Sequence, residues 1–339
     1  MPNSFEQTRR QSRSPHYLVT IIAWLILVIL VGAVYLWYSG YMQSKKFAPV
    51  SSGYIFLNLK TSGKNSHLYL FNVSTGALEQ SPVQAFAPSI SVDHRYVVGS
   101  QNTPQNAGSA GGIYLYDLVS QASTLIAPSK DQFPLFAQQS PDDIRSAFNQ
   151  YMTTKIASQA SVPSSWGIYI ASTSSAPQLI AQGLYPRWSP DGASILYLGD
   201  DGLHLYSLHS ATDMPVWPLN NGSASSRMML SISEDGKMLA WTNPLHQEIV
   251  VAHIVSWSPF EFKIVDRITD IYGFWPIFSP DDTTVAFEQV DWDIASSNAL
   301  PVHPRLVVYN VVSNQPKTVL DLSSYDQTTI FMSGWVNNL

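Results

Sequence analysis

Cysteine is absent from the sequence and charged residues are scarce. The absence of cysteine excludes disulfide bonds, thiolate metal sites and a cysteine nucleophile. Charged residues make up 12% of the 339 residues, about half of the usual share of about 25%. Hydrophobic residues make up 45% and aromatic residues 12%, which excludes a disordered acidic or basic protein. The length allows two domains or one large all-β domain.

The sequence also lacks the short motifs of common enzyme classes. It contains no G-x-S-x-G nucleophile elbow, no H-E-x-x-H zinc motif, no P-loop and no G-x-G-x-x-G dinucleotide motif. We therefore expect a protein that is not an enzyme and that has no cofactor.

One long uncharged run lies near the N-terminus. Residues 18–38 read LVTIIAWLILVILVGAVYLWY, which is 21 residues without a charge. A helix of this length rises about 30 Å, the thickness of the hydrocarbon core of a membrane. Trp24 lies toward one end and tyrosine and tryptophan residues crowd the other, as in an interfacial aromatic belt. The run predicts one transmembrane helix that acts as an uncleaved signal-anchor.

The flanking charges predict the orientation of this helix. Arg9, Arg10 and Arg13 precede it, and Lys45 and Lys46 follow it, so the positive-inside rule places the N-terminus inside the cell. Without residues 1–42 the chain has 15 basic and 23 acidic residues, a net charge of −8, which argues against nucleic acid as a partner. The expected organisation in a bacterial cytoplasmic membrane is a cytoplasmic tail over 1–17, a transmembrane helix over 18–38, a linker over 39–52 and an external domain over 53–339.

A turn motif of the form Ser-Pro-Asp-Gly recurs through the external domain. Its serines fall at positions 91, 140, 189, 233 and 279, with spacings of 49, 49, 44 and 46 residues. Apolar segments flank the clear copies. In such a hairpin proline fixes φ, aspartate bonds back to the backbone, and glycine accepts a positive φ. The turn residues to which we assign this structural role are Ser189, Pro190, Asp191, Gly192, Ser233, Asp235, Gly236, Ser279, Pro280 and Asp281.

The repeat predicts an all-β fold, a β-propeller. Each turn is followed by a second hairpin, so that four strands recur every 44–49 residues, as in a propeller blade. The segment that starts at Gly53 reads as the last three strands of a blade, and 329–336 reads as an opening strand. Pairing of these two segments would complete a ring of six blades and remove open sheet edges. Five or seven blades are the alternatives.

The third blade is irregular between positions 133 and 165. Ser140-Pro141-Asp142-Asp143 fits a turn, but it also fits a helix start with serine as N-cap and proline at the first position. Apolar residues from Ile144 to Ile156 then recur at helical spacing. We expect a short helix inserted between blades two and three, and a divergent blade hairpin is the alternative.

These motifs resemble the TolB-type, WD40-like propeller family. The resemblance rests on 185–192, on 275–282 and on weaker copies, and it covers about 285 residues. It implies a propeller that binds other proteins of the cell envelope, as TolB does in the periplasm. The chain departs from TolB in its predicted membrane anchor and in lacking an obvious additional α/β domain. Similar propellers also cap the catalytic domain of prolyl oligopeptidase-type peptidases, but no hydrolase domain is expected here.

Two aromatic segments are candidate binding loops. The first is the expected insertion 290–304, with Trp292 and His303, and the second is the run VSWSPFEF, with Trp257 and Phe260. Exposed aromatic residues in long loops are typical of binding surfaces. The alternative for Trp292 and Trp257 is that they pack between blades.

Two residue groups are weaker candidates for metal sites. His204 and His209 lie five positions apart across a turn, and Asp291 and Asp293 alternate near Asn298, as Ca²⁺ ligands can. A hydrogen-bonded strand histidine and a solvated acidic loop are the simpler interpretations, so we expect no bound metal.

The favoured function is a non-catalytic scaffold that binds an envelope protein or peptide. One alternative is a sensor of a glycan or small ligand, which would need a membrane partner because the cytoplasmic tail is short. The other is a propeller hydrolase or lyase acting on polysaccharide, which would need acids or histidines gathered at the channel mouth.

Overall fold

The structure is a computed structural model, and it describes residues 52–61, 66–81, 83, 85–91, 95–101, 111–129, 134–151, 166–218, 229–243, 247–293, 300–323 and 325–337. All of them belong to one compact unit, Pro49–Leu339. The predicted transmembrane helix over 18–38 lies outside the described residues. Within the described ranges, no helix is long and apolar enough to cross a membrane.

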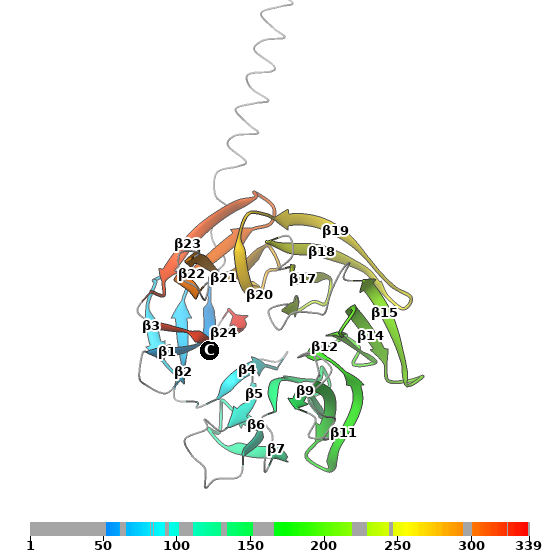
Figure 1. Cartoon of the computed structure of the whole chain (residues 1–339). Helices are drawn as coiled ribbons and strands as arrows, with labels where there is room; N and C mark the ends of the chain where they lie inside the picture. Colours follow the sequence, from blue (N-terminus) through cyan, green and yellow to red (C-terminus); the bar gives the residue numbers. More distant parts are fainter. Residues whose placement is uncertain are drawn as a thin grey trace, which may run out of the picture. The chain divides into compact units, whose positions relative to one another are not determined.

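The strands form six four-stranded antiparallel sheets arranged as the blades of a propeller (Figure 1). Blade 1 consists of β24 (Tyr325–Val336), β1 (Tyr54–Thr61), β2 (Ser66–Asn72) and β3 (Leu78–Gln80). Blade 2 consists of β4 (Phe86–Ile90), β5 (Tyr96–Gln101), β6 (Gly111–Asp117) and β7 (Ser123–Ser129). Blade 3 consists of β8 (Leu135–Gln139), β9 (Arg145–Tyr151), β10 (Trp166–Ser172) and β11 (Ser175–Gln182).

Blade 4 consists of β12 (Leu184–Trp188), β13 (Ser194–Leu198), β14 (Gly202–Ser207) and β15 (Thr212–Pro218). Blade 5 consists of β16 (Leu230–Ile232), β17 (Met238–Asn243), β18 (Glu248–Trp257) and β19 (Phe260–Ile268). Blade 6 consists of β20 (Tyr272–Phe278), β21 (Thr284–Asp293), β22 (Leu300–Asn310) and β23 (Gln315–Asp321). The prediction of an all-β propeller with six blades is confirmed.

The burial of each strand follows its place in the blade. Second strands lie between neighbouring strands of their blade and are mostly buried, and in β13 the four residues Ile195–Leu198 are all buried. Fourth strands lie at the rim, and β15 and β23 are exposed over most of their length. The core therefore consists of apolar layers between neighbouring blades, and Trp241 is among its largest fully buried side chains.

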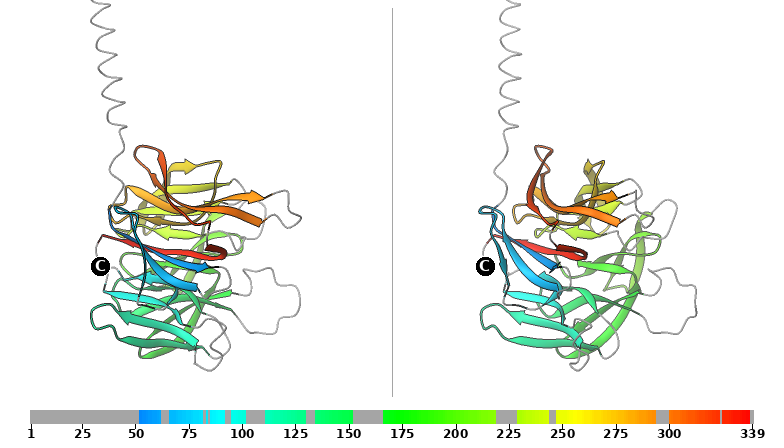
Figure 2. Two further views of the ribbon diagram at one scale, coloured as in Figure 1. Left: turned by 90° about the vertical axis from the view of Figure 1, so that its left-hand side faces the viewer. Right: turned by 60° about the vertical axis from the view of Figure 1, so that its left-hand side comes forward.

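Strands from both ends of the chain share blade 1. β24 is its innermost strand, and it pairs antiparallel with β1, so that Tyr54 lies opposite Val336 and Thr61 opposite Tyr325. Figure 2 shows β24 in red lying beside β1 in blue. This pairing closes the ring, and the order of the innermost strands around the axis is β24, β4, β8, β12, β16 and β20.

The prediction of a helix after Ser140 is wrong. Residues Arg145–Tyr151 form β9, which pairs with β8 and β10. The Arg145 N–H donates to Ser140 Oγ at 3.0 Å, and Asp143 adopts a φ of +56°, so the chain reverses as in a hairpin. The segment 140–143, Ser-Pro-Asp-Asp, suits both a helix start and a turn. Pairing with β10 favours the turn followed by the strand β9. Ile156, part of the helical pattern, lies outside the described residues.

Candidate functional site

The repeat turns lie where the first strand of a blade meets the second. In blade 4 the Ser189 N–H donates to the Ser194 carbonyl and the Ser194 N–H donates to Ser189 Oγ, both at 2.9 Å. The Ser189 hydroxyl in turn donates to Asp191 Oδ1 at 2.6 Å. The turns around Ser233 and Ser279 repeat this arrangement. These buried hydroxyls are held by the turn itself, so the turns form a rigid frame at this end of the axis.

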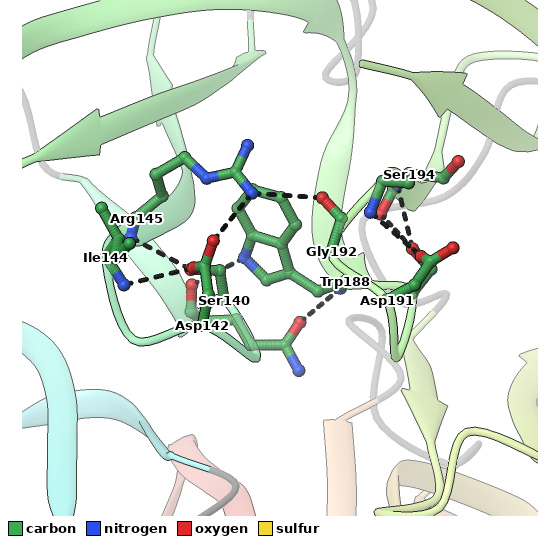
Figure 3. Close-up of polar contacts among 11 residues, drawn as sticks. Ser140, Asp142, Ile144, Arg145, Trp188, Asp191, Gly192 and Ser194 are labelled. Atoms are coloured by element: carbon green, nitrogen blue, oxygen red, sulfur yellow. Dashed lines mark hydrogen bonds and ion pairs between the residues drawn. The ribbon is translucent and has the colours of Figure 1, made fainter. Parts of the chain in front are cut away.

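A side chain of blade 3 ties two of these turns together (Figure 3). Arg145 Nη2 donates to Asp142 Oδ2 within its own turn and to the Gly192 carbonyl in the turn of blade 4, both at 3.2 Å. The same guanidinium lies 4.9 Å from the ring centre of Trp188, at cation–π distance. The turns of blades 3 and 4 are therefore held at a fixed separation.

A cavity of about 170 Å³ lies on the propeller axis and is lined by the innermost strands of all six blades. At about 10–15 Å³ for each water centre, it has room for roughly ten water molecules. Its wall reaches the repeat turns, where Pro190 and Glu234 line it and are exposed to solvent. The mouth of the cavity is therefore at the turns.

One register position supplies a ring of residues in the wall of this cavity. It lies two residues before the turn serine and pairs with the residue seven positions after that serine, as Arg187 pairs with Leu196. Gly334 of β24 has the equivalent position, because it pairs with Phe56 at the corresponding point of β1. We call these residues the axial ring, and they are Ser89, Gln138, Arg187, Ser231, Ile277 and Gly334.

Arg187 is the only charged member of the axial ring. Its Nη1 donates to the Pro186 carbonyl at 3.0 Å, and no carboxylate of the described residues forms an ion pair with it. Removal from bulk water lowers the pKa of Arg187 to about 10, so it stays cationic at neutral pH. In the neighbouring blade, Gln138 Oε1 accepts from the Trp188 N–H at 2.9 Å, which leaves the amide N–H groups of Gln138 as donors.

Aromatic side chains cross the axis at the other end of the cavity. Phe136 of blade 3 stacks on Trp275 of blade 6, the opposite blade, with ring centres 5.2 Å apart, and Tyr185 of blade 4 packs edge-on against both rings. All three residues have a positive φ and lie at a β-bulge of the innermost strand. A bulge turns a side chain out of the regular alternation of a strand. We call these three residues the aromatic plug, and it lies across the axis at the end of the cavity away from the turns.

Carboxylates gather at one side of the mouth. Asp282 in the turn of blade 6 is partly buried, and this burial together with the nearby carboxylate of Asp235 raises the pKa of Asp282 to about 7. Lys237 Nζ lies 2.7 Å from Asp235 Oδ2. Burial by itself would raise the pKa of Asp235, but hydrogen bonds, among them the one from Lys237, lower this pKa to about 2. Together with Glu234, these residues give this side of the mouth a negative charge.

A second buried polar position lies nine residues after the turn serine, on the second strand. In blade 6 it holds Glu288, whose Oε1 has no hydrogen-bond partner, and burial raises the pKa of Glu288 to about 8. In blade 1 the equivalent Asn58 donates to the Ala85 carbonyl at 2.8 Å and accepts from the Ala87 N–H at 2.9 Å. Asn58 therefore links blade 1 to the start of blade 2.

The aromatic residues of the run VSWSPFEF lie at the end of an outer hairpin. Trp257 and Phe260 pair across the turn between β18 and β19, with ring centres 5.2 Å apart. Trp257 Nε1 donates to the Gly236 carbonyl at 3.0 Å, and Phe260 contacts Phe262. Both side chains are partly buried against the core between blades 4 and 5. The structure therefore places them in blade packing and away from the axial cavity.

The expected loop 290–304 is largely an extension of two strands. Trp292 lies in β21 opposite Pro301 of β22, and its side chain lies outside the described residues. His303 is exposed, with Nδ1 3.7 Å from Asp291 Oδ2. This hairpin extends the second and third strands of blade 6, and His303 is not among the residues that line the axial cavity.

The first candidate metal site, at His204, lies within the described residues, and the second, around Asp291, lies only partly within them. Both ring nitrogens of His204 face carboxylates, with Nδ1 2.9 Å from Asp213 and Nε2 2.6 Å from Asp201. Asp291 accepts a hydrogen bond from Arg305 at 2.8 Å, while the side chain of Asp293 and the whole of Asn298 lie outside the described residues. In the described part of the chain, no three His, Asp or Glu residues are grouped as metal ligands.

Sequence reasoning missed the axial ring and the aromatic plug. The repeat copies include Arg187, Tyr185 and Trp275, but only as residues that flank the turns. Counting back from each turn serine gives the signal: position −2 holds Arg187 and Gln138, and position −4 holds the three aromatic residues of the plug. The two positions could have been found by aligning the copies on their serines.

Comparison with known proteins identifies the fold and no family. The chain matches no model of a known protein family and no curated protein. Among solved structures it is similar to TolB from Acinetobacter baumannii, with a TM-score of 0.58 and 17% identity over 85% of this chain and 67% of that one. It is also similar to oligogalacturonate lyase from Vibrio parahaemolyticus, with a TM-score of 0.51 and 11% identity over 82% and 80% of the two chains. A chain of a nidogen/laminin complex gives a TM-score of 0.53 and 10% identity, over 85% and 100%. The similar structures thus include a lyase as well as TolB.

Proposed function

We propose that this chain is a non-catalytic binding protein of the bacterial cell envelope. In this proposal residues 18–38 anchor it in the cytoplasmic membrane with the propeller outside, and a peptide segment of a partner protein enters the axial cavity through the mouth. The observation that carries the proposal is the pocket of about 170 Å³ on the axis, to which every blade contributes.

The wall of the pocket suits a peptide better than a purely apolar or purely charged ligand. It combines the donors of Arg187 and Gln138 with the apolar side chains of Ile232 and Ile277. Ligand sites of this kind are mostly apolar with a few placed polar groups. The surrounding turns are fixed by their own hydrogen bonds, so the pocket is largely formed before a ligand arrives and little ordering entropy opposes binding.

Two further observations favour binding over catalysis. The described residues contain no group of three metal-ligating side chains, and the single cation of the axial ring has no acid or base beside it in that ring. The repeat resembles TolB-type propellers, and that resemblance implies binding of envelope proteins. A polysaccharide lyase or hydrolase would instead need catalytic groups that converge on one substrate bond.

The test is site-specific photocrosslinking in intact bacterial cells that make the full-length chain. A photoreactive amino acid replaces Glu234, which is exposed at the mouth, and a matched variant carries it at Val119, which is 80% exposed on the turn after β6. We expect an adduct with one envelope protein from position 234 and none from position 119. Equal adducts from both positions, or no adduct from position 234, would overturn the peptide-binding proposal.

The predicted topology has its own test in the same cells. Membrane fractions are separated, and protease is added to spheroplasts whose cytoplasmic membrane is intact. The proposal expects the chain in the membrane fraction and the propeller digested from outside. A protected propeller would show that it faces the cytoplasm and would overturn the proposed location.

A further inference from the structure

We propose that the axial ring binds a single carboxylate group of the ligand, and that Arg187 is the residue that pairs with it. This inference rests on the proposed function, which it deepens by naming the chemical group that the pocket selects. It is carried by the place of Arg187 within the wall of the axial cavity and by the absence, among the described residues, of a carboxylate paired with it.

An isolated cation in the wall of the fold has a free-energy cost. Arg187 is half-buried on β12 between the buried residues Pro186 and Trp188, and its one side-chain hydrogen bond to the described residues leaves most of its N–H groups without partners among them. A charged group withdrawn from bulk water destabilises a fold unless it is paired. A carboxylate that enters the pocket would meet a guanidinium whose planar N–H groups match its two oxygens.

Further hydrogen-bond donors stand beside Arg187 in the same ring. Gln138 of blade 3 has its carbonyl oxygen engaged by the Trp188 N–H, so its amide N–H groups are the part of the side chain that can donate to a ligand. Ser231 of blade 5 carries a hydroxyl in the cavity wall. These two blades flank blade 4, so the donors stand on either side of Arg187. The axial ring contains no acidic residue, and this arrangement of donors around one cation favours an anion.

The charges around the cavity favour an anion with one negative charge. The ring offers one cation and its other five members are uncharged, with Gly334 on the opposite blade, blade 1, and Ile277 on blade 6. Glu234 and the neighbouring carboxylates make one side of the mouth negative. A phosphate dianion or a run of acidic groups would be repelled at the mouth and left partly unpaired inside. A carboxylate on an apolar stem fits both the charge and the wall.

The experiment uses purified full-length chain in detergent and defined probes. N-acetyl-Ala-Leu with a free C-terminal carboxylate is titrated against its C-terminal amide and against inorganic phosphate. The readout is the fluorescence of the tryptophans, because Trp188 and Trp275 line the cavity, with a thermal shift as the second measurement. Arg187→Gln is compared with Arg187→Lys, which keeps the charge, and with Arg95→Gln, which removes an exposed arginine that precedes β5 and pairs with Asp117 at the end of β6.

We expect the free acid to bind the unchanged protein about ten- to hundredfold more tightly than the amide, as for a hydrogen bond to a charged group. Arg187→Gln should lose the same factor for the acid, Arg187→Lys should lose less, and Arg95→Gln should lose nothing. Equal binding of acid and amide, which needs no variant, would overturn the inference, and so would the absence of binding at about 10 mM. Tighter binding of phosphate than of the acid would overturn the assignment to a carboxylate.

The outcome is separable from that of the proposed function. A partner crosslinked at position 234, together with equal binding of acid and amide, would leave the scaffold standing and remove the carboxylate site. A strong preference for the acid without any crosslinked partner would keep the site and remove the protein partner.

Discussion

Gly236 and Pro190 lie so close together that no side chain fits between them. A Cβ placed on Gly236 would stand 1.9 Å from Cγ of Pro190. Gly236 ends the turn of blade 5 and Pro190 belongs to the turn of blade 4, and both line the mouth of the axial cavity. The contact therefore sets the spacing of two neighbouring turns.

Substitution of Gly236 tests this spacing. Gly236 has a φ of +70° and Gly76 a φ of +73°, but nothing lies within 4 Å of a Cβ at Gly76. Gly76→Ala should cost about 1 kcal/mol from the backbone alone, and Gly236→Ala should cost about 1–3 kcal/mol more because Pro190 must move. Denaturant unfolding of the two full-length variants gives the comparison. Equal losses would show that the contact with Pro190 is easily relaxed.

The turn serines should be needed for stability. Ser279 Oγ accepts from the Thr284 N–H at 3.0 Å and donates to Asp281 Oδ1 at 2.6 Å. Ser279→Ala leaves both groups without these partners and should lower the free energy of unfolding by about 1–3 kcal/mol. The exposed Ser74, in the turn between β2 and β3, provides the matched control Ser74→Ala. A loss at Ser279 no larger than that control would contradict the role assigned to the repeat.

Glu288 should make the fold less stable as the pH rises. Burial raises its pKa from 4.5 to about 8, so the folded state holds the proton more tightly than the unfolded state does. Stability from this group is fully present below pH 4.5 and is lost as the pH rises toward 8, by a few kcal/mol at most. Glu288→Gln should abolish this fall and make the protein more stable at pH 8.

Thermal unfolding between pH 4 and pH 9 checks the expectation for Glu288. Glu261→Gln, on the exposed side of β19, controls for the loss of one acidic residue. If the variant and the unchanged protein lose stability in parallel over this range, the carboxyl of Glu288 is not the group responsible.

The aromatic plug should couple opposite blades energetically. Phe136 and Trp275 stack at 5.2 Å across the axis. Phe136→Leu, Trp275→Leu and the double variant form a cycle that should give a coupling energy of about 0.5–1.5 kcal/mol. The same cycle with Trp257→Leu in place of Trp275→Leu should give almost none, because Trp257 packs at the outer edge of blade 5. Additive losses in the first cycle would show that the two rings do not support each other.

The blades were predictable because the turns that separate their strands are determined by a few residues that are adjacent in sequence. A serine, a proline, an aspartate and a residue that tolerates positive φ are enough to reverse the chain, and these recur in sequence at nearly constant spacing. The helix expected after Ser140 failed for the same reason. The four residues Ser-Pro-Asp-Asp at 140–143 fit both a helix start and a turn. The choice between the two depends on β10, which begins at Trp166 and pairs with β9 along its whole length.

The site was harder to predict than the fold because it depends on register. Trp257 and Phe260 were conspicuous in the sequence, but the hairpin of β18 and β19 holds them against the core. Arg187 looked like one more flank of the repeat. Its place on the axis follows from a bulge at Tyr185 that shifts the pairing of β12 with β13, and from five other strands that converge on the same point.

The pairing of β1 with β24 has a consequence for synthesis. The two strands are separated by almost the whole propeller in sequence, between Thr61 and Tyr325. At about 5–20 residues per second, the ribosome needs on the order of 10–50 seconds to supply the partner of β1 after β1 itself is made. During that time the inner edge of blade 1 offers free backbone groups to any other strand. The speed of elongation therefore sets how long a nascent chain is open to pairing with its neighbours.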